Sequence, residues 1–537
     1  MSTDESEIIH SSLPELKNQL SRKEIGRRDF IRTATLLGLS AGAAYGFAGI
    51  LAPEQLQAAT PKKGGMLKLG MVMQEMNDPA NFNWIEPSNI ARHICDYLVE
   101  VDENNISRPA LAEKWRASDD LKTWTFDLRK GVKFNNGDDF TADDVIYNVK
   151  RWTDKDSKSV NKTILKDLKE VEKVNDHQVI FHLNEAKLDL VENLFQYSMV
   201  IVHRDFDKNG ADLSKFPVGT GAFTLESYEV GNKAVLKKRK GYWNGDANLD
   251  QITVIDLGTE YQAYLNALAA KQIDLAYAIE NDHVSVAKKL KHVQVFKANT
   301  SQTLCIRMKV NKKPFDDIRV RQAITLCADN KKLLAVAVRG QGVLAENHHV
   351  APIHPEYAKL PALKQNVAQA KKLLAEAGYK NGLDVECFVG NTQGRFEQQT
   401  LEVLREMLLK ANIRMKINVL PTAQFWPIWD KADFSTTFWA HRPLGTMVLG
   451  LAYITGAIWN ETEFSNAEFD AAYKRAVSTV DPVKRAAHIK VCEKILQDNC
   501  VMVQPYWRQL FTAGDKKVKN FKMHPAQYLN LTKVWLG

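Results

Sequence analysis

A short loop near residue 440 carries the side chains best suited to hold a small molecule. It follows an apolar stretch with the pattern of a strand and reads Trp439-Ala-His441-Arg442-Pro. Trp439 offers an apolar face, His441 a hydrogen-bond donor or acceptor, and Arg442 a rigid fork that suits a carboxylate or phosphate. The loop therefore predicts a binding site with an apolar wall and a group that recognises negative charge.

Two other stretches could complete this site. Trp459 begins an aromatic, amide and acid triplet farther along the chain, and Asn77 and Trp84 bound a loop that follows an early strand. We expect Trp459 to add to the 439–442 loop, and Asn77 and Trp84 to supply the opposing wall. The alternatives are that Trp439 and Trp459 lie in the core and that Arg442 forms a structural salt bridge.

A histidine-rich loop raises metal binding as a rival interpretation. His348, His349 and His354 cluster within residues 346–357, and His441 lies in the proposed site. Metal ligands need converging lone pairs, and one cluster in a proline-containing loop argues for them only weakly. We therefore predict no resident metal.

Catalytic signatures are missing from the sequence. It contains no G-x-S-x-G, H-E-x-x-H or Walker motif in a supporting context, and abundant carboxylates do not by themselves make a catalytic constellation. We expect neither enzymatic activity nor a cofactor.

The 439–442 loop would be placed by repeated helix–strand units in the second half of the chain. Hydrophobic periodicity predicts strands over residues 383–389, 413–419 and 434–439, and helices over residues 367–377, 396–411 and 423–431. Such alternation is typical of βαβ units and a largely parallel sheet, which makes the fold class α/β. Ligands of open α/β sheets bind beyond the carboxyl ends of the strands, where the 439–442 loop begins.

Four separated stretches carry recognisable sequence patterns, namely Gly131–Arg151, Pro217–Phe223, Gly241–Trp243 and Lys312–Ala328. Within the last of them, Pro314 turns the chain and Asp316 can cap the helix that follows. In this order the four stretches resemble signatures of the peptide/nickel-type (family 5) extracellular solute-binding proteins of ABC importers. The resemblance covers essentially all of the mature chain.

The resemblance implies a two-lobed periplasmic-binding-protein fold of type II, in its large peptide-binding-like form with an extra subdomain in lobe I. It also implies capture of a small organic solute between the lobes, without altering it, and delivery to the permease subunits of an ABC transporter. Peptide-binding members usually carry an aspartate in the loop after residue 439, which pairs with the amino terminus of the ligand. Here His441 and Arg442 occupy that loop, which favours a peptide-like or amino-acid-like solute with an anionic end. A metal chelate of the nickel type or an oligosaccharide is the alternative.

At 537 residues the chain is too long for a single core. We predict lobe I over residues 60–302, an extra subdomain within it at about 85–215, lobe II over residues 303–505, and a C-terminal return to lobe I over residues 506–537. Two crossing strands, Thr303–Met308 and Val501–Pro505, would join the lobes.

The N-terminus has the pattern of an export signal. Arg27 and Arg28 are followed by Phe30 and then by a weakly apolar, glycine-rich run, which is typical of a twin-arginine signal peptide. Residues 1–59 would form this signal and a flexible N-terminus, with cleavage near residue 59 beside the small residues Ala58 and Ala59. The twin-arginine export machinery would then be a partner and the periplasm the destination. A retained membrane anchor is the alternative.

The net charge and the cysteines narrow the kinds of partner and of site that the chain can have. The net charge of +8 is spread over short clusters, with no basic run interleaved with aromatic residues, so we expect no nucleic-acid partner. None of the six cysteines forms a C-x-x-C motif, although Cys492 and Cys500 could pair in an oxidising compartment. We expect the protein to be a monomer.

Overall fold

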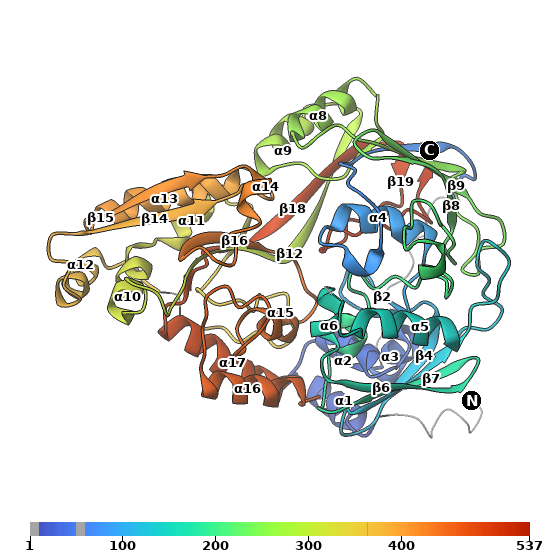
Figure 1. Ribbon diagram of the computed structural model, residues 1–537, viewed down its shortest axis with the longest axis horizontal. Helices are drawn as coiled ribbons and strands as arrows, with labels where there is room; N and C mark the ends of the chain where they lie inside the picture. Colours follow the sequence, from blue (N-terminus) through green and yellow to red (C-terminus); the bar gives the residue numbers. More distant parts are fainter. Residues whose placement is uncertain (1–9, 50–59, 158, 362) are drawn as a thin grey trace. The chain divides into compact units, whose positions relative to one another are not determined.

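The computed structural model of the chain describes residues 10–49, 60–157, 159–361 and 363–537 (Figure 1). These residues fold as two compact units. Unit 1 runs to Ile279 and includes His283–Lys297 and Phe511–Gly537, and unit 2 consists of Glu280–Asp282 and Ala298–Leu510. The cleavage position predicted beside Ala58 and Ala59 lies outside the described residues.

Unit 1 is built on a mixed sheet. Strand β1 (Met66–Gly70) lies between β10 (Gln251–Ile255) and β11 (Leu275–Ala276), parallel to both, and β9 (Lys233–Lys238) and β8 (Phe223–Glu229) continue the sheet in antiparallel pairs. Leu67 and Leu69 of β1 are buried, since alternate side chains of a strand point to the same face of the sheet. The accompanying helices are α4 (Ile85–Ile94), α8 (Tyr261–Ala269) and α9 (Val284–Ala287).

Helix α4 begins at Ile85 and includes Pro87, which is tolerated in the first turn of a helix. It ends at Ile94, and Cys95 is extended, so that the next residue, Asp96, can accept hydrogen bonds from Thr220 and other donors.

A second, antiparallel sheet of unit 1 has the strand order β4–β5–β7–β6. Its strands are β4 (Ala112–Ala117), β5 (Thr123–Leu128), β7 (Gln178–Leu183) and β6 (Leu168–Asn175). The helix after Thr141 is α5 (Ala142–Thr153), and the Thr141 N–H donates to Asp144 Oδ2 at 2.9 Å in a capping box. Shorter elements nearby are β2 (Val99–Val101), β3 (Ser107–Pro109), α6 (Val160–Ile164) and α7 (Leu190–Asn193).

The N-terminal segment forms three helices in unit 1. They are α1 (Leu13–Ser21), α2 (Arg27–Leu36) and α3 (Ala41–Phe47), and Figure 1 draws them beside the antiparallel sheet. The indole N–H of Trp115 in β4 donates to the carbonyl of Leu36 at 2.9 Å, so this segment is in direct contact with the sheet.

Unit 2 has a sheet in which β15 (Ile413–Val419), β14 (Leu383–Val389) and β16 (Phe434–Trp439) are parallel, and β12 (Val293–Met308) runs antiparallel to β16. The three parallel strands have the bounds that periodicity predicts. Helices α10, α12 and α13 cover an apolar core built on this sheet. The helices of the unit are α10 (Ile318–Cys327), α11 (Asn330–Ala337), α12 (Val367–Glu376), α13 (Phe396–Leu409), α14 (Thr422–Phe425), α15 (Gly445–Ala452), α16 (Ala467–Val477) and α17 (Pro482–Asp498).

Two local predictions in unit 2 need correction. Asp317, and not Asp316, is the N-cap of α10 and accepts from the Arg319 N–H at 2.8 Å. Helix α14 ends at Phe425 rather than near Lys431, since Pro427 follows and disfavours continuation of the helix.

The chain passes between the units on β12 and on β18 (Tyr506–Asp515), which are neighbours in the strand order. The segment Val501–Pro505, predicted as the return crossing, lies within unit 2. It contains β17 (Met502–Val503), which pairs with Ile306 and Arg307 of β12. The remaining strands are β13 (Gly342–Leu344), β19 (Val518–Lys519) and β20 (Trp535–Leu536).

Two chemical features of the described residues bear on function. None of their helices combines the length and the apolar character that spanning a membrane requires. Cys492 and Cys500 are buried free thiols, like the other four cysteines, so the pairing considered for them is not formed.

Candidate functional site

Trp439 and Trp459 come together in unit 2. Trp439 is the last residue of β16 and is 5% exposed, whereas Trp459 is half-buried. Their rings meet edge to face with 5.9 Å between centroids. The Trp439 ring also meets His349 edge to face at 5.3 Å. This pair of rings forms an apolar wall of which Trp459 is the more accessible part.

An ion pair inside unit 2 holds Trp439 in place. Glu461 Oε1 accepts from the Trp439 indole N–H at 3.0 Å, and its Oε2 accepts from Thr437 and faces Arg307 Nε at 3.4 Å. Burial raises the pKa of the Glu461 carboxyl, and Arg307 acts in the opposite direction. Glu461 is therefore committed to supporting the wall.

His441 is fixed by the backbone of β12. It is 2% exposed, and its Nδ1 accepts from the Ser301 N–H at 3.0 Å. Because Nδ1 accepts from a backbone donor, the neutral ring carries its proton on Nε2. His441 thus has a defined orientation next to Arg442.

Arg442 combines burial with a guanidinium that hydrogen-bonds to no described residue. The residue is 6% exposed, and its main chain is held in place: its N–H donates to Ser301 Oγ at 3.2 Å and its carbonyl accepts from His354 Nε2 at 2.9 Å. None of its side-chain nitrogens is among the fully buried atoms that lack a partner, so the guanidinium keeps access to solvent although most of the residue is buried. This guanidinium is the strongest ligand-directed feature of the loop.

The three clustered histidines are held by separate protein partners. His348 Nε2 lies 2.8 Å from Glu346, His349 Nδ1 lies 3.0 Å from the Tyr453 hydroxyl, and His354 bonds to the Arg442 carbonyl. Burial lowers the pKa of His349 to about 3, with smaller contributions from its cationic neighbours, so its ring is neutral. Among the described residues, no group of three or more His, Cys, Asp or Glu side chains is arranged to hold a metal ion.

Arg395 was missed by sequence reasoning. It lies in the loop after β14, and since β14 and β16 are parallel, this loop emerges at the same sheet edge as the 439–442 loop. Its N–H donates to Glu280 Oε1 at 3.0 Å, while its exposed guanidinium bonds to no residue that the structure describes. Applying the strand-end rule to every parallel strand would have found it.

Glu397 fixes the conformation of the loop that carries Arg395. Its Oε1 accepts from Thr392 Oγ1 at 3.0 Å and from the Gln393 N–H at 2.8 Å. The residue is 1% exposed, and burial raises its pKa to about 7. The loop is thus ordered by a buried carboxyl group.

Asn77 and Trp84 lie in unit 1, in the segment after the carboxyl end of β1. Asn77 is exposed and donates to Glu75 Oε2 at 3.0 Å, and Trp84 is the half-buried residue that precedes α4. They occupy in unit 1 a strand-end position like that of the 439–442 loop in unit 2.

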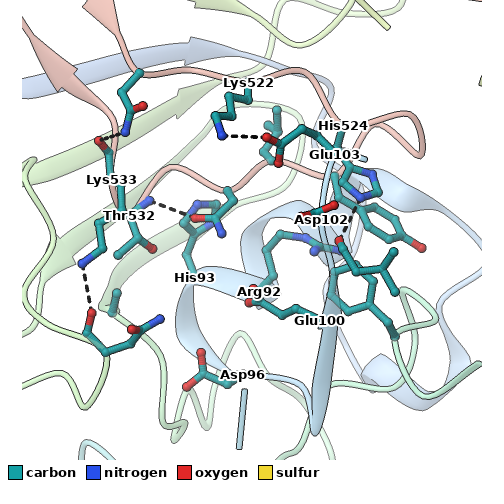
Figure 2. Close-up of a pocket in the computed structure, with 18 of the residues that line it drawn as sticks. Arg92, His93, Asp96, Glu100, Asp102, Glu103, Lys522, His524, Thr532 and Lys533 are labelled. Carbon is teal, nitrogen blue, oxygen red and sulfur yellow. Dashed lines mark hydrogen bonds and ion pairs between the residues drawn. The ribbon is translucent and has the colours of Figure 1, made fainter. Parts of the chain in front are cut away.

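Unit 1 contains a separate polar cavity of about 290 Å³ between α4, β2 and the C-terminal segment (Figure 2). The predicted site residues do not line it. Several of its charged groups bond to protein, with Lys522 Nζ 2.7 Å from Glu103 and Lys533 Nζ 2.9 Å from the Asn244 carbonyl. Burial raises the pKa of Glu100 to about 7. The two lysine contacts tie the C-terminal segment to the residues that follow β2 and β9.

Two of the signature patterns build the region beside this cavity. Asp96 accepts from Thr220 Oγ1 at 2.9 Å, and from Tyr242 and Trp243 at 2.8 Å each. Gly219 packs so closely on the end of α4 that a Cβ there would lie 2.1 Å from the Ile94 carbonyl oxygen. The Gly-Thr-Gly and Gly-Tyr-Trp patterns therefore have a structural role.

Comparison with known proteins defines the class. The profile of bacterial extracellular solute-binding proteins, family 5 (middle part), matches residues 107–444, and the chain belongs to this family. Glutathione-binding protein GsiB of Salmonella choleraesuis strain SC-B67 is 25% identical over 473 residues, covering 83% of this chain and 90% of the relative.

Solved structures share the fold at lower identity. The periplasmic binding protein DppA of Helicobacter pylori, in complex with peptide STSA, has a TM-score of 0.79 at 23% identity and covers 88% of this chain and 98% of its own. AgaA of A. tumefaciens R10, in complex with agropinic acid, has a TM-score of 0.79 at 22% identity and covers 88% and 99%. The predicted two-lobed type II fold of the α/β class is thereby confirmed.

Family membership confirms the general function that the signatures predict. The chain is a solute-binding protein of the kind that serves ABC importers, and its relatives are binding proteins of transport systems. The family is extracellular, so its members act outside the cytoplasm.

Proposed function

We propose that the protein is exported by the twin-arginine route, binds a peptide-like or amino-acid-like solute with an anionic end in the periplasm, and passes it to an ABC permease. The observation that carries the anionic end is Arg442, a largely buried residue whose guanidinium has no side-chain partner among the described residues. A carboxylate or phosphate would offer this fork two parallel hydrogen bonds. Solutes of this chemistry are bound by the relatives named for glutathione and agropinic acid.

The other predicted residues have distinct roles in this proposal. Trp459 supplies the accessible face of the apolar wall, and Trp439 supports it from the interior. His441 lies next to Arg442 in the same loop, and Asn77 and Trp84 are the residues of unit 1 that we propose for solute binding. Arg395 adds a second positive group at the sheet edge of Arg442.

A metal chelate is the less favoured solute. Recognition of a metal centre by His348, His349 or His354 would require these rings to leave the partners that now hold them. Arg442 favours an organic anion without any such rearrangement.

Thermal-shift measurements test the anionic end. The probes are short peptides and amino-acid-derived dicarboxylates, each compared with its amide. We expect the free acids, and not their amides, to raise the melting temperature. Arg442→Ala should lose about 10- to 100-fold in affinity for the acids, because hydrogen bonds to charged groups contribute about 1.5–3 kcal/mol. Arg405→Ala, an exposed site beside Glu406 on α13, is the control. Equal binding of acid and amide would contradict the proposal.

A further inference from the structure

The N-terminal segment, residues 10–47, lies on a surface of unit 1 that includes β4, and Figure 1 draws its helices beside this strand. The Arg32 guanidinium donates twice to the Asn104 carbonyl, at 3.1 and 2.9 Å. The indole N–H of Trp115 donates to the Leu36 carbonyl at 2.9 Å. These bonds satisfy buried groups on both sides of the contact.

The fit extends to the backbone at Gly38. A Cβ on this glycine would lie 1.9 Å from the Trp115 carbonyl oxygen, and its φ of +104° is a conformation that other residues rarely adopt. At the other end of the segment, Ser11 Oγ donates to Asp119 at 2.7 Å. Contact this close over the whole segment requires that the receiving strands are already folded.

One part of the predicted export motif is buried and the other part is exposed to solvent. Every residue of α2 from Phe30 to Leu36 is buried, whereas Arg27 and Arg28 are exposed. Neither arginine pairs with a described residue, and positive charge in the first turn opposes the helix dipole. The two arginines therefore do not stabilise the helix, and their side chains are exposed to solvent.

Helices α1 and α3 close over the covered part. The Phe30 and Phe47 rings are stacked with 6.4 Å between centroids, and Lys17 Nζ lies 4.9 Å from the centre of the Phe47 ring. The apolar stretch of α2 is thus held between unit 1 and its own neighbouring helices.

We propose that the surface formed by Asn104, Trp115 and Asp119 is a docking site for the protein's own export segment. In the folded precursor it covers the apolar residues of the motif and Arg32, and it leaves Arg27 and Arg28 accessible. The segment must leave this surface before its apolar stretch can enter the export machinery. Because the site exists only on folded strands, docking marks the precursor as folded. The role in export rests on the twin-arginine route proposed above, whereas the docking itself does not.

Hydrogen exchange of the purified full-length precursor, prepared from cells that lack the translocase, tests the docking. The amides of residues 31–37 should exchange at least tenfold more slowly than in a synthetic peptide of residues 10–47. Gly38→Ala should abolish this protection by expelling the segment. Gly46→Ala is the matched control, since a Cβ there meets nothing within 4 Å. Trp115→Phe, which removes only the indole donor, should raise exchange about fivefold.

The outcomes separate docking from export. Exchange in the wild-type precursor equal to that of the peptide, or full protection in Gly38→Ala, would overturn the docking site. Arg27→Lys combined with Arg28→Lys should block export and leave protection unchanged. If that variant is exported normally, the twin-arginine route fails while the docking result stands. With docking established, Gly38→Ala precursor should be exported faster than Gly46→Ala precursor, and equal rates would remove release as a step in export.

Discussion

Two arginines of unit 2 show how the surroundings of a residue decide its role. Arg307 is fully buried, and its Nε lies 3.4 Å from Glu461. Its other two guanidinium nitrogens donate hydrogen bonds to the backbone carbonyls of residues 432 and 429. Arg442 is 6% exposed, and its guanidinium bonds to none of the described residues. The first arginine stabilises the fold, and the second is the one for which we propose contact with the solute.

Loss of Arg307 should destabilise unit 2 strongly. Arg307→Met leaves the Glu461 carboxylate buried without its cation, and breaking such a pair costs about 3–5 kcal/mol. Urea unfolding measures the loss. Adding Glu461→Gln should recover part of it, because the unpaired charge is then removed. A loss below about 1 kcal/mol in the single variant would show that the pair does not hold the wall.

The fork of Arg442 should matter as well as its charge. Arg442→Lys keeps the positive charge but loses the planar pair of donors, so we expect a loss of about tenfold in affinity for a carboxylate ligand, smaller than for Arg442→Ala. Calorimetric titration with the free acid that gives the largest thermal shift measures the difference. Equal affinity of the lysine and arginine proteins would contradict bidentate recognition.

At the scale of elements, the ends of parallel strands position the residues of the proposed site. Strands β14 and β16 are parallel, so their loops bring Arg395 and Arg442 to one edge of the sheet. The Arg395 loop is ordered by the buried carboxyl group of Glu397.

The titration of Glu397 should be visible in stability. Its pKa of about 7 in the folded protein lies above the ordinary 4.5. The folded state therefore keeps a proton that the unfolded state has lost, and stability falls as the pH rises from 4.5 to 7, by up to about 3 kcal/mol. Glu397→Gln should match the wild type at pH 5 and exceed it in melting temperature at pH 8. Glu406→Gln, an exposed change on the same helix, serves as control, and parallel pH profiles for all three proteins would refute this effect.

The packing of the Gly-Thr-Gly pattern should be intolerant of a methyl group. Gly219→Ala would place Cβ 2.1 Å from the Ile94 carbonyl oxygen, and overpacking of this kind costs about 1–3 kcal/mol or more. Gly231→Ala meets open space and suffers only from its left-handed backbone, at about 1 kcal/mol. Chemical unfolding compares the two. A smaller loss for Gly219→Ala would argue against the structural role of this pattern.

The sequence predicted elements better than contacts. The strands over residues 383–389, 413–419 and 434–439 have the bounds that periodicity gives, because local alternation determines them. The Arg307–Glu461 pair could not be foreseen, since it joins residues far apart in the chain. Arg395 was missed because the strand-end rule was applied to one strand of the parallel set. The docking of residues 10–47 was missed because an export signal was expected to be flexible.

At the scale of the molecule, the chain crosses between its units on β12 and β18. Two neighbouring strands leave few points at which the backbone must bend if the units change their relative orientation. A ligand can shift the equilibrium between two conformations only by the difference between its binding free energies to them.

Ligand binding should therefore stabilise the whole chain. A solute at about 100 times its Kd adds about 2.7 kcal/mol to the free energy of unfolding, and a single cooperative rise in melting temperature would follow if both units hold it. Differential scanning calorimetry distinguishes this from stabilisation of unit 2 alone. A shift confined to one of two resolved transitions would show that the solute contacts only one unit.

Native mass spectrometry of the exported protein, purified without denaturation, tests the central claim most directly. The account predicts a single intact, noncovalently bound organic solute with a carboxylate or phosphate group on the wild-type protein and on Arg405→Ala, and its loss from Arg442→Ala. A neutral or purely cationic solute, retained equally by Arg442→Ala, would contradict it.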